Sequence, residues 1–156
     1  MSGGVTTFAI VAAATLAATA GAVIVHFEGL ATLGRHLARL RERTEGVLPA
    51  RRTLIKLFTT LFSLHVVHIV LFGLVYWSLS RWIAGGGEHG GALALGDALY
   101  LSAITFTTVG YGDISPTGAL RFVAATEALL GFMLLTWSAS FAYLQMARQW
   151  RDGPTR

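Results

Sequence analysis

The residues best suited to a chemical task lie at positions 107–113, where the sequence reads TTVGYGD. A dehydrated potassium ion needs about eight oxygen neighbours in place of its water shell, and backbone carbonyls supply them when they all point inward. Gly110 and Gly112 lack a Cβ, which makes the unusual dihedral angles of such a carbonyl column accessible. We therefore predict a cation-binding column formed by the backbone of Thr108, Val109, Gly110, Tyr111 and Gly112.

The neighbouring side chains would support this column. We expect Val109 and Tyr111 to point outward into the surrounding protein and so to hold the column open. Thr107 ends a short helix, whose C-terminal dipole would favour a cation near the centre of the membrane. Asp113 follows the column at its outer mouth, where it would attract cations or hydrogen-bond the back of the column.

Apolar stretches must hold this loop in a membrane. The 156-residue chain is 54% hydrophobic and 13% charged, with a mean hydropathy of +0.61, outside the range of soluble globular chains. Residues 5–27, 54–83 and 122–146 are each long enough to cross about 30 Å of hydrocarbon. The apolar run 92–109 is too short to span the membrane. The sequence thus predicts an all-α membrane protein with three transmembrane helices, a re-entrant pore helix and a filter loop.

The same pattern predicts the domain organisation. The expected parts are an additional N-terminal helix (1–28), a basic amphipathic linker (29–53), a pore domain (54–150) and a short tail (151–156). Within the pore domain we expect an outer helix (54–83), a glycine-rich turret (84–94), a pore helix (95–107), a filter (108–112) and an inner helix (118–150). The pore loop occurs once, so a closed pore requires several chains.

Basic residues are distributed asymmetrically, which predicts the topology. They lie between the first two spans and after the third, at Arg35, Arg39, Arg41, Arg43, Arg51, Arg52, Lys56, Arg148, Arg151 and Arg156. By the positive-inside rule these segments are cytoplasmic, so the N-terminus is outside and the C-terminus inside the cell membrane. The linker suits an amphipathic helix on the inner leaflet, with anionic lipid rather than nucleic acid as its partner. A voltage sensor is the weaker alternative, because the arginines do not repeat every third position within an apolar span.

Several residues inside the predicted spans have two possible roles. Glu127 either braces the pore helix against Ser102 or Thr105, or attracts ions and takes part in gating. His65 and His68 share one face of the second span, and we expect no further ligands nearby and hence no transition-metal site. Neutral packing is the expected role of this pair, with pH sensing as the alternative.

Small residues in the first span predict a packing face. Ala13, Ala17 and Gly21 recur at four-residue spacing, which would let another helix approach closely.

Residues 54–150 resemble the pore module of potassium channels. TTVGYGD preceded by ALYLS at 98–102 and followed by Pro116 is a specific signature in a chain with spans on both sides. TVGYG is the established filter loop of those channels, so its assignment here applies a known principle. The chain is most similar in pattern to small bacterial ion channels that have a pore module and little else. The resemblance implies a homotetramer with three identical partner subunits, permeant potassium and no cofactor.

The resemblance also implies roles along the third span. Gly131 matches a glycine at which many inner helices bend, although close helix packing is an equal alternative. Residues at helical spacing below it are candidates for the cavity wall: Phe132, Leu135, Ala139 and Tyr143. The position of Ile104 is often Glu in the family, where it pairs with the aspartate after the filter. That pair cannot form here, so filter stability and slow inactivation are expected to differ.

These observations predict a potassium-selective channel and no enzyme, because no acid, base and nucleophile converge. The alternatives are a less selective cation channel and a non-conducting membrane sensor or scaffold subunit.

Overall fold

The computed structural model describes residues 2–43, 50–85 and 91–152, and these form four helices and no strand. The helices are α1 (Ser2–Arg43), α2 (Ala50–Gly85), α3 (Leu95–Phe106) and α4 (Leu120–Asp152). Three of them, α1, α2 and α4, are long and apolar enough to cross a membrane, whereas α3 is a short apolar helix. The predicted all-helical membrane fold is confirmed.

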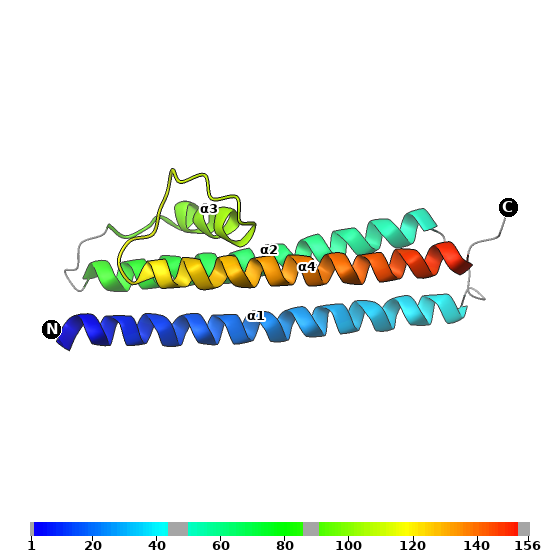
Figure 1. Ribbon diagram of the computed structural model, residues 1–156, viewed down its shortest axis with the longest axis horizontal. Helices are drawn as coiled ribbons and strands as arrows, with labels where there is room; N and C mark the ends of the chain where they lie inside the picture. The colour runs from blue at the N-terminus through cyan, green and yellow to red at the C-terminus, as the bar shows by residue number, and fades with distance from the viewer. Residues whose placement is uncertain (1, 44–49, 86–90, 153–156) are drawn as a thin grey trace.

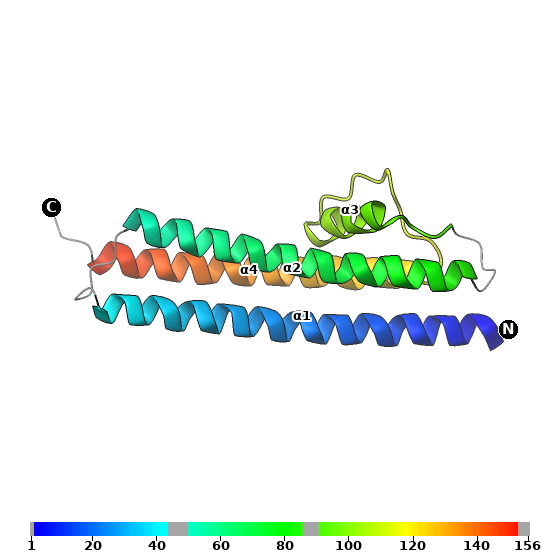
Figure 2. The same cartoon turned by 180° about the vertical axis from the view of Figure 1, so that it is seen from behind.

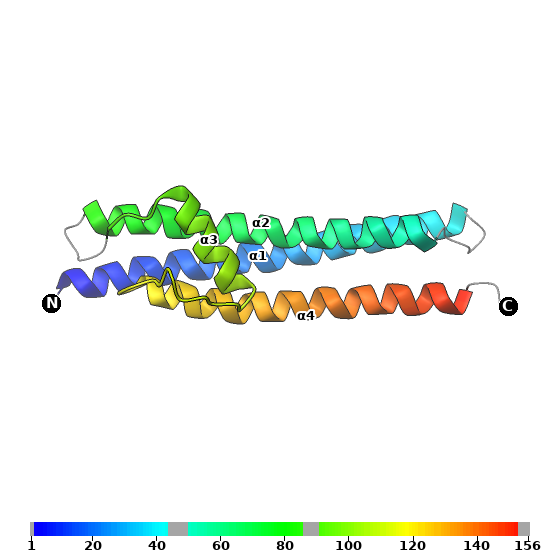
Figure 3. The same cartoon turned by 90° about the horizontal axis from the view of Figure 1, so that it is seen from above.

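The three long helices lie side by side, and α3 packs on one face of the pair formed by α2 and α4 (Figure 1). The reverse view shows α1 along the side of this pair that α3 does not cover (Figure 2). Seen from above, α3 crosses in front of α2 and α4 while α1 runs behind them (Figure 3). The N-terminal end of α1 lies at the same end of the bundle as α3, and α4 ends at the opposite end.

The predicted boundary between an N-terminal span and a surface linker is wrong. One unbroken helix, α1, covers both segments, and at 1.5 Å per residue its 42 residues are about 63 Å long. Three leucines of the expected linker, Leu30, Leu33 and Leu37, form a buried stripe on α1. This stripe packs in one cluster with Leu57 and Leu61 of α2 and Ala142 of α4. Burial of this stripe against the bundle removes the apolar face that would have rested on the membrane surface.

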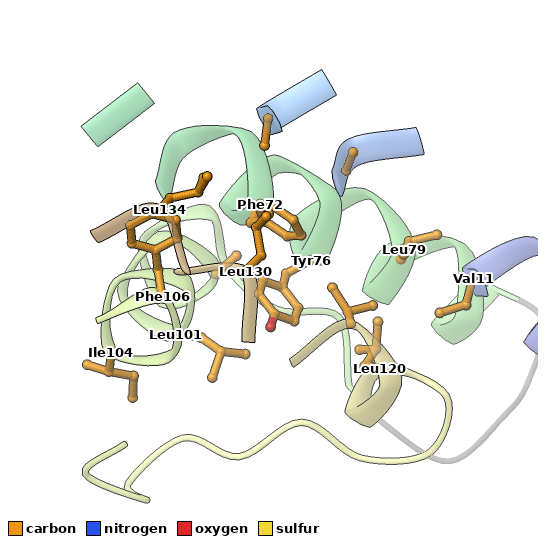
Figure 4. Close-up of a cluster of buried hydrophobic side chains, with 14 residues drawn as sticks. Val11, Phe72, Tyr76, Leu79, Leu101, Ile104, Phe106, Leu120, Leu130 and Leu134 are labelled. Carbon is orange, nitrogen blue, oxygen red and sulfur yellow. The ribbon is translucent and has the colours of Figure 1, made fainter. Parts of the chain in front are cut away.

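The main core surrounds α3 and joins all four helices. Phe72 and Tyr76 of α2 are fully buried, as is Phe106 at the end of α3. Figure 4 shows Leu130 of α4 beside Phe72 and Tyr76, with Leu101 of α3 beyond them. α3 is therefore held by a continuous apolar core inside one chain.

The stripe of small residues predicted to pack does not face this core. Ala13 and Ala17 are exposed, and no atom lies within 4 Å of a Cβ built on Gly21. The buried face of α1 is the adjacent one, formed by Val11, Thr15, Ala18 and Ala22. Both faces carry small residues, and the face with Ala18 and Ala22 is the one that packs against α2 and α4.

Other predicted boundaries differ by a few residues. The outer helix, predicted at 54–83, is longer at both ends and covers 50–85. The inner helix, predicted at 118–150, begins and ends two residues later, at 120 and 152. The pore helix ends one residue early, at Phe106. Parts of the predicted linker (44–49), turret (86–90) and tail (153–156) lie outside the described residues.

Candidate ion-binding site

The loop after α3 folds back onto the last turn of that helix. The backbone N–H of Thr107 donates to Ala103 O at 3.2 Å, and that of Thr108 donates to Thr105 O at 2.9 Å. The N–H of Gly110 then donates to Ile104 O at 3.0 Å, which ties the middle of the loop to the helix. The Thr107 hydroxyl also donates to Ala103 O, at 2.7 Å. The start of the predicted filter is therefore positioned by the carbonyls that end α3.

Alternate residues of the loop have left-handed backbone angles. The φ angles are 59° at Thr108, 55° at Gly110 and 83° at Gly112, and Thr108 is the only non-glycine with positive φ among the described residues. In a regular strand, successive residues face opposite sides. Reversal of handedness at every second residue breaks that alternation and allows successive carbonyls to share one side. This is the geometry that an inward carbonyl column requires.

Thr108 adopts its angle at an energetic cost. A β-branched residue in the left-handed region is a steric outlier, and the penalty is about 1–2 kcal/mol. Strain of this kind persists where surrounding contacts over-determine it, and it is concentrated at functional positions. The hydrogen bonds from Thr108 and Gly110 to the end of α3 supply such contacts here.

The side chains of the loop find no cover within their own chain. Val109 is 51% exposed and Tyr111 is 74% exposed. Residues 107–113 are all exposed. The surrounding protein that we expected to hold Val109 and Tyr111 is therefore not supplied by the described part of the same chain.

A hydrogen bond between a tyrosine and an aspartate connects the outer end of the loop to α3. The Tyr100 hydroxyl donates to Asp113 Oδ2 at 2.9 Å. This bond raises the pKa of the Tyr100 phenol, so the hydroxyl remains a donor. Tyr100 precedes Ile104 by one helical turn, and Ile104 itself is buried in the core. Sequence reasoning missed Tyr100, although its position one turn before Ile104 was a usable signal.

Two glycines form a notch that admits α3. A Cβ on Gly73 of α2 would come within 2.6 Å of Leu99 Cδ2 and 3.1 Å of Leu99 Cα. A Cβ on Gly131 of α4 would come within 2.1 Å of Phe106 O and 2.8 Å of Phe106 C. The structure therefore places Gly131 in close packing against the end of the pore helix, and α4 continues as a helix through it.

Glu127 joins α4 to both α2 and α3. It is fully buried and accepts hydrogen bonds from Tyr76 Oη at 2.7 Å and from Ser102 Oγ at 2.6 Å. Ser102 Oγ also lies 2.8 Å from Ile69 O. Of the two roles considered for Glu127, the contact with Ser102 is the one expected of a residue that braces α3. Tyr76 is a further partner that the sequence did not indicate.

The cavity candidates on α4 differ in how far they are exposed. Phe132, Ala139 and Tyr143 are exposed, and Thr136 completes the same face at spacings of four, three and four residues. Leu135 is instead partly buried against the main core. Leu135 is three residues from Phe132 and four from Ala139, so it lies at the edge of their face, where the exposed surface of α4 meets the core.

A third histidine lies beside the pair in the second span. His26 of α1 is within ring-contact distance of both His65 and His68 of α2. One ring nitrogen from each residue lies within 4.8 Å of the other two. The expectation that no further ligand is available near His65 and His68 is therefore wrong, because α1 packs on α2 at this level.

Comparison with known proteins identifies the family. The sequence profile of a family described as "Ion channel" matches residues 54–146, more than half of the chain. The chain belongs to the ion channel family. The match takes in α2, α3, the loop after α3 and most of α4, so it confirms the resemblance to the potassium-channel pore module, and α1 lies outside it.

Curated relatives of this ion channel protein match only part of their own lengths. It is 52% identical over 40 residues to Protein LctB of Geobacillus stearothermophilus, which covers 26% of the chain and 30% of that protein. Protein LctB of Bacillus caldotenax is 50% identical with the same coverage. The Inward rectifier potassium channel Kirbac3.1 of Paramagnetospirillum magnetotacticum is 34% identical over 91 residues, covering 58% of the chain and 30% of that protein. The chain thus spans less than a third of each relative, and no solved structure matches it significantly.

Proposed function

We propose that four copies of this chain form a potassium-selective channel, in which ions pass passively along the backbone carbonyls of residues 108–112. The observation that supports this most directly is the alternation of positive φ at Thr108, Gly110 and Gly112 in a loop tied to the end of α3. A column of carbonyls replaces the hydration shell of the ion, and stacked sites allow both entry and exit. Potassium is the cargo, and the process has no chemical step and no organic cofactor.

The tetramer is proposed because one chain leaves the filter unsupported. Val109 and Tyr111 are exposed in the chain alone, and each chain has one pore loop. Neighbouring subunits would cover these side chains and complete the ring of carbonyls. The exposed face of α4 with Phe132, Ala139 and Tyr143 would then line the cavity or meet the adjacent subunit.

The pore helix contributes an electrostatic part of the mechanism. α3 ends at Phe106 with Thr107 as its C-cap, and the partial negative charge of a helix C-terminus favours a cation within about one turn. In a tetramer, four such ends would surround the ion below the filter. Asp113, held by Tyr100, would add negative charge at the outer mouth.

We propose that the protein lies in the cell membrane. Its N-terminus would then be outside the cell and the C-terminal end of α4 in the cytoplasm. The N-terminal end of α1 lies at the α3 end of the bundle, and the arginine-rich ends of the long helices lie at the other end (Figure 1). A groove between α1 and α4 is lined by Arg35, Arg148, Gln145 and mostly apolar residues, which suits an anionic lipid headgroup with its acyl chain. No nucleic acid partner is proposed.

The decisive test is ion flux with the purified protein alone. Liposomes loaded with potassium should take up rubidium and exclude sodium. Gly110→Ala, which forces a Cβ into a left-handed position, should abolish uptake. Gly96→Ala is the matched control, because a Cβ there meets no atom within 4 Å and φ is not in the left-handed region.

Two other outcomes would replace the proposal. Equal uptake of sodium and rubidium would indicate a cation pore of lower selectivity. No uptake, together with a monomer or dimer in detergent, would indicate a non-conducting sensor or scaffold.

A further inference from the structure

Three histidines meet inside the bundle, none of them in the filter loop. His26 of α1 lies opposite His65 and His68 of α2, with ring centroids 5.6 Å and 5.4 Å from its own, and the last two are 6.4 Å apart. His26 and His68 are fully buried, and His65 is partly buried. Ion conduction as proposed above uses none of them.

The contacts of His68 leave one of its nitrogens with a free lone pair. Its Nδ1 faces Leu64 O, and its Nε2 lies 3.0 Å from Ala22 O. A neutral imidazole has one N–H, so only one of these carbonyls can receive a hydrogen bond. Donation from Nδ1 to Leu64 O leaves Nε2 available, and a backbone carbonyl is the usual partner of the second nitrogen of a metal-bound histidine.

Each of the other two rings has one nitrogen without a partner. Nδ1 of His26 and Nδ1 of His65 are buried and have no hydrogen-bond partner among the described residues. His26 Nε2 lies 3.3 Å from Ser138 Oγ of α4, which can accept a hydrogen bond from the Nε2–H group. Buried nitrogens without partners are costly, and an ion that accepts all three lone pairs removes that cost.

We propose that His26 Nδ1, His65 Nδ1 and His68 Nε2 bind one divalent transition-metal ion of the zinc class. Imidazole nitrogens suit such ions, whereas magnesium and calcium prefer oxygen ligands. At zinc–nitrogen distances of about 2.0–2.1 Å the nitrogens would be about 3.4 Å apart, so the rings, now within 4.8 Å, move together on binding. His65 is the least enclosed ring and has the most freedom to make that movement. Water takes the fourth position.

The site would fasten the additional helix α1 to the pore module. The rings of His65 and His68 lie 5.8 Å and 5.9 Å from that of Phe106, the last residue of α3. Ser138 extends the contact to α4 through His26. An ion at this point therefore links α1 to α2 directly beneath the start of the filter.

Metal titration of the full chain in detergent, after removal of bound metal with a chelator, tests this inference. The chain has no cysteine, so thiolates cannot contribute to binding. We expect one Co²⁺ or Zn²⁺ per chain, with the strong visible absorption of four-coordinate Co²⁺. His65→Gln should weaken binding at least about a hundredfold, and Ser138→Ala, which removes only an outer partner, about tenfold.

The control is a variant that changes the two remaining histidines of the sequence, His36→Gln with His89→Gln, and its binding should equal that of the unchanged chain. The inference is overturned if the unchanged chain binds no metal, if His65→Gln binds as tightly, or if the control loses the ion. Helical content by circular dichroism accompanies each titration. Should His65→Gln fail to fold, the Co²⁺ spectrum of the unchanged chain decides, because weak six-coordinate absorption contradicts the proposed site.

Discussion

The carbonyl oxygen of Phe106 lies where a side chain at position 131 would begin, because a Cβ on Gly131 would come within 2.1 Å of it. Phe106 ends α3, and the bonds that position the filter loop start from the same turn. Gly131 thus sets how closely the end of α3 approaches α4. A bend of α4 at Gly131 during gating would have to occur while Gly131 stays packed against Phe106.

Replacement of Gly131 by alanine should displace α3 and disrupt the filter. The overlap involves backbone atoms, which cannot rotate away, so we expect a loss of about 3 kcal/mol in stability, at the upper end of the usual cost of overpacking, and no ion flux. Thermal unfolding in detergent and rubidium uptake measure the two effects. Gly21→Ala is the control, because its Cβ meets no atom and alanine favours the helix by about 1 kcal/mol. A Gly131→Ala protein that is stable but gated differently would support the hinge instead.

Glu127 should tolerate glutamine better than alanine. Ser102 has one hydroxyl proton but faces both Glu127 Oε1 and Ile69 O, and a glutamine amide can donate to Ser102 so that Ser102 donates to Ile69. We expect Glu127→Gln to stay within about 1 kcal/mol of the unchanged chain. Glu127→Ala leaves a cavity and two buried hydroxyls with a lost partner, which costs about 2–4 kcal/mol. Equal melting temperatures for the two variants would contradict this role.

Loss of the bond between Tyr100 and Asp113 should destabilise the outer end of the filter. Tyr100→Phe removes only the hydroxyl, so we expect faster inactivation of currents recorded in lipid bilayers. Asp113→Asn should have a similar effect. The two changes together should add less than the sum of their separate effects, because they remove one interaction. Strict additivity would show that the residues act independently.

Ile104 should control inactivation through its place behind the filter. It is buried, and its carbonyl accepts the N–H of Gly110. Ile104→Glu introduces the residue that family members often have, and its carboxyl group would compete with Tyr100 for the neighbourhood of Asp113. We expect a changed rate of slow inactivation, recorded as current decay at constant voltage. An unchanged rate would count against a role for this position.

The exposed face of α4 should be accessible to water in the assembled protein. The chain has no cysteine, so Ala139→Cys introduces a single thiol on that face. A charged thiol reagent should modify it and reduce rubidium flux. Ala17→Cys, on an exposed face of α1 within the hydrocarbon span, should react at least about tenfold more slowly because a thiol in hydrocarbon does not ionise. Similar rates at the two positions would remove Ala139 from the cavity wall.

The three spans and the pore helix could be predicted because local signals define them. Apolar length alone identifies a membrane helix, and the backbone freedom of Gly110 and Gly112 is a property of those residues themselves. The structure agrees on the left-handed angles of both glycines, and Thr108 shares them without a sequence signal. A β-branched residue is not expected there, so only the bonds to the end of α3 explain its angle.

The packing of the first span (5–27) could not be predicted, because apolar or small residues occur on all its sides. Ala13 and Gly21 belong to one small-residue face, and Ala18 and Ala22 to the next. A lipid-facing helix has no polar face to distinguish them, so only the shapes of α2 and α4 decide. The same uncertainty hid His26, whose place beside His65 depends on which face of α1 turns inward.

Because α1 is a single helix from Ser2 to Arg43, it acts as a stiff rod alongside the pore module. No turn lies between its basic end and the level of α3, so sideways force applied near Arg43 is carried to the opposite end rather than absorbed on the way. The leucines at 30, 33 and 37 and the histidine at 26 are the points at which that force reaches α2.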